Sequence, residues 1–265
     1  MAAEKKKDSA LWETVKTVIF AVVIAIGIRT VAYEPFKIPS GSMRPTLLIG
    51  DYLFVSKFSY GYSKYSLPFD LPIIPGRIFF TEPERGDVVV FRPPGEIETN
   101  FIKRLVGLPG DKIELRHGRL YINDNLIDRQ PTTEYKSYKD LGLTMLKVYE
   151  EDFGDAGVHT IHEFNDNQIS DNVGPYIVPD EKYFLMGDNR DRSSDSRFGP
   201  AGHPGSITGI MQQGAVGYVP AENLIGRADF LFFSIDRDPK VDGSILKFWN
   251  WPFWIRWSRL FNTIN

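Results

Sequence analysis

The residues best suited to chemistry begin with a serine in a proline-flanked loop. Ser42 lies in Ser40-Gly41-Ser42-Met43, between Pro39 and Pro45. A proline holds the residue before it extended, and a glycine allows close backbone approach. The segment can therefore present a hydroxyl and an N–H to a bound carbonyl. A simple connecting turn accounts equally well for this short string taken alone.

A serine attacks an amide only when a base takes its proton. The usual base is histidine, and the chain has four of them, in turn-like or polar stretches without a recurring pattern: His117, His159, His162 and His203. Lys103 is the other candidate base, because it lies in the apolar run 100–106 and burial favours the neutral form of a lysine. The pKa would have to fall from near 10.4 to roughly 7–8. Since neighbours in a strand face opposite sides, we expect one of Lys103 and Arg104 to point inward. The alternative is a lysine at a sheet edge, in solvent.

Charged residues alternate along 187–197, directly after an apolar stretch. Such a loop could be a salt-bridged network or a site for phosphate or metal. Calcium loops combine regularly spaced aspartates with a later glutamate, whereas the arginines here would repel a cation. We therefore predict an orienting network with an Asp195–Arg197 ion pair, and Ser193 free to hydrogen-bond an amine. No metal and no cofactor are expected.

The composition predicts a folded protein, because 42% of the 265 residues are hydrophobic and 25% are charged. The net charge of −3 argues against a general nucleic-acid binder. Cysteine is absent, which excludes disulfides, thiolate metal sites and a cysteine nucleophile.

The N-terminus combines Lys5-Lys6-Lys7 with an uncharged run at 18–28. Extended to 11–33, this segment gives about 30 Å of helix, enough to span a bilayer, with Trp12 and Tyr33 at the interfaces. We expect a cytoplasmic N-terminus at 1–10 and a retained anchor at 11–33, with the rest of the chain outside. The alternatives are a cleavable signal peptide, for which Thr30-Val31-Ala32 is a passable site, and a buried core helix.

The rest of the chain has the pattern of a β protein, without a long amphipathic helical period. We predict strands at 51–58, 87–92, 100–106, 111–116, 119–123, 183–186 and 228–235. The fold class is therefore mainly β, with a β-rich core at 34–125 and 176–240. Residues 126–175 are expected to form an inserted lobe, since 135–172 are polar, acidic and weakly patterned. The glycine-rich stretch 198–217 is expected to be an exposed loop.

The C-terminal segment 241–265 is aromatic. Its four tryptophans are interleaved with cations: Trp249, Trp251, Trp254 and Trp257 with Lys247, Arg256 and Arg259. Pro252 prevents one uninterrupted helix. A core strand or an apolar cap is one interpretation. We favour a membrane-interfacial segment, where indoles and cations occur together.

Four ordered motifs resemble those of bacterial type I signal peptidase. Residues 34–47 are similar to its nucleophile box, 50–61 to its second box, 85–91 with 102–111 to its lysine box, and 187–197 to its last box. The resemblance implies a transmembrane helix followed by a β-rich catalytic domain. It also implies a serine endopeptidase that removes signal peptides from exported preproteins after small residues, in an A-x-A-like pattern.

By motif position, the resemblance implies that Ser42 is the nucleophile and Lys103 the general base. The Ser42 N–H and the Ser40 hydroxyl would hold the oxyanion, Ser193 would orient Lys103, and Asp195 and Arg197 would support the site. The expected apolar substrate pocket is lined by Phe36, Ile38, Pro39, Met43, Leu47, Leu53, Val90, Phe101 and Ile102.

The implied partners are preproteins, membrane lipid and, indirectly, the export machinery, with no nucleic acid. The implied location is the bacterial cytoplasmic membrane, crossed once. The single anchor, the modest lobe and the 198–217 stretch depart from some family members, and the last two bear on substrate preference. Two alternatives remain: a Ser/Lys self-cleaving regulator, for which no DNA-binding segment is visible, and a non-catalytic membrane-tethered β scaffold.

Overall fold

The computed structural model describes residues 2–95, 98–136, 146–166, 168–199, 203, 216–236, 249 and 251–264. Most of the loop expected at 198–217, and Lys247 in the C-terminal segment, lie outside the described residues.

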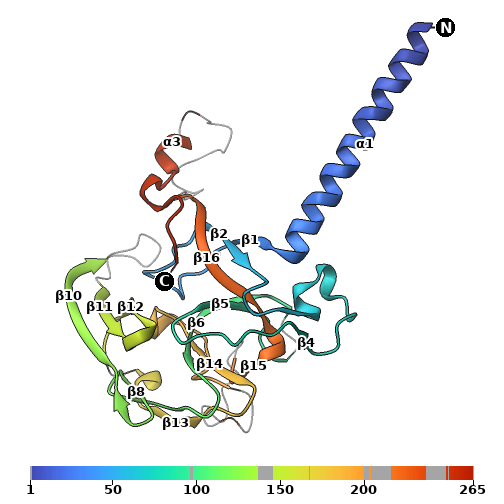
Figure 1. Cartoon of the computed structure of the whole chain (residues 1–265). Helices are drawn as coiled ribbons and strands as arrows, with labels where there is room; N and C mark the ends of the chain where they lie inside the picture. Colours follow the sequence, from blue (N-terminus) through green and yellow to red (C-terminus); the bar gives the residue numbers. More distant parts are fainter. Residues whose placement is uncertain are drawn as a thin grey trace.

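The chain begins with one long helix, α1 (Ala2–Val31), which projects away from the β-rich part (Figure 1). Within it, Trp12–Val31 has a mean hydropathy of 1.9, and none of this stretch is buried in the protein. The alternative of a buried core helix is therefore excluded. The helix ends against the β-rich part, where the Tyr62 hydroxyl donates to the Val31 carbonyl at 2.6 Å.

The main sheet has seven strands in the order β1-β2-β16-β5-β6-β14-β15. They are β1 (Tyr33–Lys37), β2 (Asp51–Ser56), β16 (Leu224–Ser234), β5 (Val88–Phe91), β6 (Phe101–Gly107), β14 (Lys182–Met186) and β15 (Val219–Pro220). All their pairings are antiparallel. Register shifts interrupt β16 after Ala228 and after Leu231, and such bulges bend a strand. The late strand β16 thus lies between the early strands β2 and β5 (Figure 1).

Smaller sheets flank the main one. One contains β13 (Val173–Ile177), β7 (Lys112–Arg116), β8 (Arg119–Ile122) and β9 (Asn125–Leu126), and a short pair joins β3 (Tyr62–Ser63) to β4 (Arg77–Ile78). The third contains β10 (Asp128–Lys136), β11 (Leu146–Asp152) and β12 (Val158–Glu163).

All seven predicted strands are present, as β2, β5, β6, β7, β8, β14 and β16. The sequence pattern did not reveal the strands at 128–163, because charged residues occur on both faces of β11. Residues paired across antiparallel strands share a face, so Val148, opposite His162, and Ile161, opposite Tyr149, lie on opposite faces of this sheet. Leu146, Val148 and Ile161 are nevertheless at most 3% exposed. The region judged weakly patterned therefore contains the strands β11 and β12 and part of β10.

Three apolar clusters form the core. The first lies under the loop that carries Ser42 and joins Ile38, Met43 and Leu47 to strands β2, β5 and β16. Strand β6 contributes Ile102 to this cluster and Phe101 and Leu105 to the second. Both faces of β6 are thus covered, which agrees with its nearly continuous apolar sequence.

The C-terminal segment contains the short helix α3 (Trp251–Trp254) and the 3-10 turn η9 (Trp257–Arg259). Beyond them the chain runs beside β16, where Phe261 N donates to Leu231 O at 2.8 Å and Ile264 N to Asp229 O at 2.9 Å. These hydrogen bonds occupy the edge of β16 beyond Arg227, where the pairing of β16 with β5 stops.

The interpretation of the tryptophan segment as a core element holds for one of its tryptophans, and the membrane-interfacial interpretation stays a prediction. Trp254 is only 6% exposed and belongs to the core. Trp249, Trp251 and Trp257 are 49–61% exposed, and α3 lies on the same side of the molecule as α1 (Figure 1). The two arginines face the protein. Arg256 donates to Ile49 O at 3.1 Å, and Arg259 to Thr46 O at 2.8 Å.

Candidate active site

Ser42 and Lys103 lie in direct contact. Lys103 Nζ donates a hydrogen bond to Ser42 Oγ at 2.7 Å. The residues are 61 positions apart, and β6 carries the lysine to the loop that follows β1. The Lys103 side chain is buried, with 4% exposure, and Arg104 is also buried, with 2%. One inward-pointing cation was expected here, and both are buried, because core packs on both faces of β6.

The environment of Lys103 favours its neutral form. Burial is the main influence on its pKa, which falls to about 8; the charge of Arg197 lowers it further, and those of Asp195 and Asp188 raise it. Among the described residues, no carboxylate lies within ion-pair distance of its Nζ. A buried amine without an ion-pair partner can accept a proton near neutral pH.

Arg104 supports the other side of the site. Its guanidinium makes two hydrogen bonds of 2.8 Å to the Asp188 carboxylate and a third, of 2.7 Å, to Gly86 O. Burial alone would raise the pKa of Asp188, but Arg104 holds it below the ordinary value. Asp188 also accepts a hydrogen bond from Thr46 of the nucleophile loop. Sequence reasoning missed this pair, although Arg104 adjoins Lys103 and Asp188 stands in the charged loop.

Asn189, next along the charged loop, contacts the nucleophile loop directly. Its backbone N–H donates to Ser42 O at 3.0 Å, and its side-chain Nδ2 donates to Gly41 O at 3.0 Å. No sequence signal in the charged loop distinguished this neutral residue from its neighbours.

The predicted Asp195–Arg197 ion pair is confirmed. Both side chains are fully buried, and the guanidinium makes two hydrogen bonds of 2.9 Å to the carboxylate. Gly187 N donates to the same carboxylate at 3.0 Å. The pair thus fixes the end of β14 close to Ser42.

Ser193 lies beside the site without a hydrogen bond to Lys103. Its hydroxyl is buried and has no hydrogen-bond partner among the described residues. A Cβ at Gly187 would stand 2.3 Å from Ser193 Oγ and 2.6 Å from Ser42 O, so only glycine allows this packing. The role of Ser193 in orienting the lysine stays a prediction. Ser40 is exposed on the same loop as Ser42.

The residues expected to line the substrate pocket fall into a buried group and an accessible group. Ile38, Met43, Leu47, Leu53 and Val90 are at most 2% exposed and form the packed floor. The side chains left partly accessible, which a substrate could touch, are Phe36, Pro39, Phe101 and Ile102.

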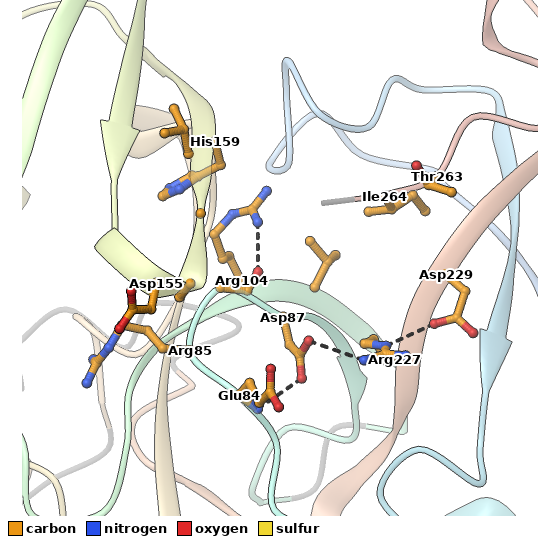
Figure 2. Close-up of a pocket in the computed structure, with 15 residues that line it drawn as sticks. Glu84, Arg85, Asp87, Arg104, Asp155, His159, Arg227, Asp229, Thr263 and Ile264 are labelled. Carbon is orange, nitrogen blue, oxygen red and sulfur yellow. Dashed lines mark hydrogen bonds and ion pairs between the residues drawn. The ribbon is translucent and has the colours of Figure 1, made fainter.

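A cavity of about 640 Å³ lies elsewhere, bordered by Arg104, His159, Asp87 and Ile264 (Figure 2). Ser42 and Lys103 do not border it. Several of its charged groups are already paired: Arg227 lies 3.0 Å from Asp229, and Arg104 pairs with Asp188 outside the cavity. The candidate active site is therefore the place where Lys103 contacts Ser42, and not this cavity. No group of metal-ligating side chains occurs in the part of the chain that the structure describes.

Comparison with known proteins agrees with this geometry. Residues 11–233 match the family described as signal peptidase, peptidase S26. Signal peptidase I of Rickettsia typhi is 42% identical over 258 residues, covering 92% of this chain and 90% of that protein. Signal peptidase I of Rickettsia canadensis is 41% identical, covering 94% and 92%.

A crystal structure of a signal peptidase I from Enterococcus faecalis is 24% identical and covers 56% of this chain and 97% of that one. Its TM-score of 0.29 is too low to support an argument about the fold. The assignment depends on the sequence relatives, which match along nearly their whole length. Together with the family match, they show that this chain belongs to the signal peptidase I family.

Proposed function

We propose that this chain cleaves signal peptides from preproteins with Ser42 as nucleophile and Lys103 as general base. The observation that carries the proposal is the 2.7 Å contact between Lys103 Nζ and Ser42 Oγ, with the lysine buried and its pKa lowered to about 8. As a member of the signal peptidase I family, the chain is a serine endopeptidase. The family match favours this activity over a self-cleaving regulator or a non-catalytic scaffold.

In the first step, neutral Lys103 takes the Ser42 hydroxyl proton as Oγ attacks the scissile carbonyl carbon. The oxyanion is held by the Ser42 N–H and the Ser40 hydroxyl. The C–N bond then breaks, and the lysine ammonium gives its proton to the leaving amine. Lys103 next takes a proton from water, which attacks the ester carbonyl. The ester C–O bond then breaks, the Lys103 ammonium returns the proton to Ser42 Oγ, and the signal peptide leaves with a free carboxylate.

Two free strand edges support binding of the substrate as an extended segment. Strand β1 pairs only with β2 among the described strands. Strand β6 pairs with β14 only from Arg104 onward, so Phe101–Lys103 keep one edge open. An added strand can use such edges. The shallow surface at Phe36 and Ile102 suits small side chains at the residues before the cleaved bond.

The helix α1 and the family match indicate a membrane-anchored protein. We further infer that the chain crosses the bacterial cytoplasmic membrane once, with its lysine-rich start inside and the β-rich part outside. The exposed tryptophans of the C-terminal segment then lie at the lipid headgroups. The substrates are preproteins at the same membrane, which gives enzyme and substrate a high effective concentration. Contact with the export machinery would be indirect.

The experiment is processing of a model preprotein in detergent by the full chain and by Ser42→Ala, Lys103→Ala and Lys103→Arg. We expect all three variants to fold and to lose cleavage, since guanidinium does not serve as a base. Lys57→Met is the matched control, because Lys57 is also buried but is paired with Glu34 at 2.8 Å. It should lose stability and keep kcat. Substantial cleavage by Lys103→Ala would refute the dyad.

A further inference from the structure

The orientation of the Ser42 N–H depends on an external contact. The Gly41 carbonyl and the Ser42 N–H belong to one planar trans peptide unit, so holding the carbonyl sets the direction of the N–H. Glycine leaves that unit unusually free to rotate. Asn189 Nδ2 donates to Gly41 O at 3.0 Å, and Asn189 N donates to Ser42 O at 3.0 Å. Asn189 therefore fixes the peptide units on both sides of the nucleophile.

Asn189 is held in turn by the three-stranded sheet β10–β11–β12. The next residue, Arg190, makes two hydrogen bonds to the Glu151 carboxylate of β11, one of 3.0 Å from Nη1 and a shorter one from Nη2. Both side chains are at most 2% exposed. His162 N of β12 donates to Asp188 O at 2.8 Å, on the other side of Asn189. Two strands of this sheet thus hold the residues before and after Asn189.

The buried Glu151 carboxylate has a second neighbour, His159 Nε2 at 3.3 Å on β12, so the charged loop and two strands of the sheet meet at this residue. Paired charges at full burial gain little stability over apolar residues of similar size, so stability alone is a weak reason for the pair of Glu151 with Arg190. Arg190 also has a backbone role, because its carbonyl accepts a 2.6 Å hydrogen bond from Arg197. The charged loop is therefore held from the Asp195–Arg197 pair on one side and from Glu151 on the other.

We propose that the three-stranded sheet is part of the catalytic apparatus, and that Glu151, through Arg190 and Asn189, is a positioning residue for the Ser42 N–H. This assignment rests on the proposed function, in which that N–H binds the oxyanion. Asn189 is the direct link and Glu151 the remote one. Neither touches the substrate.

The test measures kcat and KM of the full chain in detergent with a soluble peptide, per folded molecule, for Asn189→Ala and Glu151→Gln. Loss of a whole oxyanion donor lowers kcat by roughly 10²–10³-fold, and a misdirected donor should lose less. We expect about a tenfold lower kcat in each variant, unchanged KM and an unchanged pH profile, since the contacts of Lys103 remain.

Glu163→Gln is the matched control. Glu163 is a buried carboxylate of the same sheet, 2% exposed, and pairs with Arg129 of β10 and not with the charged loop. It should keep wild-type kcat while losing stability. Wild-type kcat in folded Glu151→Gln, or an equal loss in Glu163→Gln, would overturn the assignment.

Two further variants keep the outcome clear. If Glu151→Gln does not fold, Glu151→Asp is measured in its place. It keeps the buried charge, but its carboxylate is one methylene shorter, so Arg190 must move to keep the hydrogen bonds. Wild-type kcat in Glu151→Asp overturns the assignment. Ser42→Ala separates this proposal from the dyad. Activity in Ser42→Ala overturns both, whereas an inactive Ser42→Ala beside fully active Glu151 and Asn189 variants overturns the positioning role alone.

Discussion

The activity of this protein should follow the ionisation of one buried lysine. Burial favours the uncharged form of Lys103 and lowers its pKa from 10.5 to about 8. Only the neutral amine accepts the Ser42 proton, so kcat/KM should rise with pH and level off above the pKa.

The size of the effect follows from the shift of the pKa. A fall of 10.5 − 8 = 2.5 units corresponds to about 3.5 kcal/mol between the two protonation states, at about 1.4 kcal/mol per unit. At pH 7 about 9% of the lysine is then neutral, against roughly one part in 3,000 for a free lysine. Burial therefore increases the active fraction about 300-fold at that pH.

The assay is kcat/KM for a soluble peptide between pH 5.5 and 10, with folding checked at each pH. We expect about 1% of the plateau at pH 6, about 9% at pH 7 and half of it at pH 8, as a single proton is lost. An optimum near pH 5, or a flat profile across this range, would refute the lysine as base.

A charge variant tests the direction of the same effect. The Asp195 carboxylate raises the pKa of Lys103, and the Arg197 charge lowers it. Asp195→Asn removes the first charge and leaves the second uncompensated. Both changes move the rising limb of the profile to lower pH, and a shift to higher pH would contradict the electrostatic account.

Three other predictions concern the oxyanion, the buried ion pair and the membrane. Ser40→Ala should lower kcat by roughly 10²–10³-fold at similar KM; a change in KM alone would limit its hydroxyl to ground-state binding. Arg104→Leu should lower the free energy of unfolding by about 3–5 kcal/mol, because Asp188 is left buried without its ion-pair partner, whereas Arg116→Leu, at the surface, should change the free energy of unfolding far less, since water screens that pair; equal losses in thermal unfolding would contradict this. A chain lacking residues 2–28 should still cleave peptides and bind anionic vesicles. Replacing its exposed tryptophans Trp249, Trp251 and Trp257 by serine should release the truncated chain from the vesicles without lowering kcat. If the truncated wild-type chain stays in the supernatant, the segment does not bind lipid.

The truncation is placed before Arg29 for a structural reason. Tyr33 pairs with Ser56 and packs edge-on against Phe54, Phe58 and Phe230. Its ring is part of the β-rich unit, although the sequence placed it at the end of the anchor. Substituting Trp254 together with the exposed tryptophans would likewise disturb the core.

The sequence alone determined the local elements and the two side chains proposed to react. Apolar runs bounded by glycine and proline predicted β2, β5, β6, β14 and β16, because covered strands carry a strong local signal. Ser42 and Lys103 were identified by residue type and motif position. The Asp195–Arg197 pair was predictable because its members are two residues apart.

Only the tertiary structure decided how these elements support one another. Arg104 and Asp188 are 84 residues apart, and Arg259 and Thr46 are 213 apart. In sequence, each such residue resembles a solvated charge or a polar loop position. Its partner is fixed only when strands distant in the chain pair and water is excluded, since an unpaired buried charge is then strongly unfavourable. The same holds for the polar strands β11 and β12. The sequence does not show that Glu151 of β11 is buried, because its partner Arg190 lies 39 residues away and reaches it only in the folded chain.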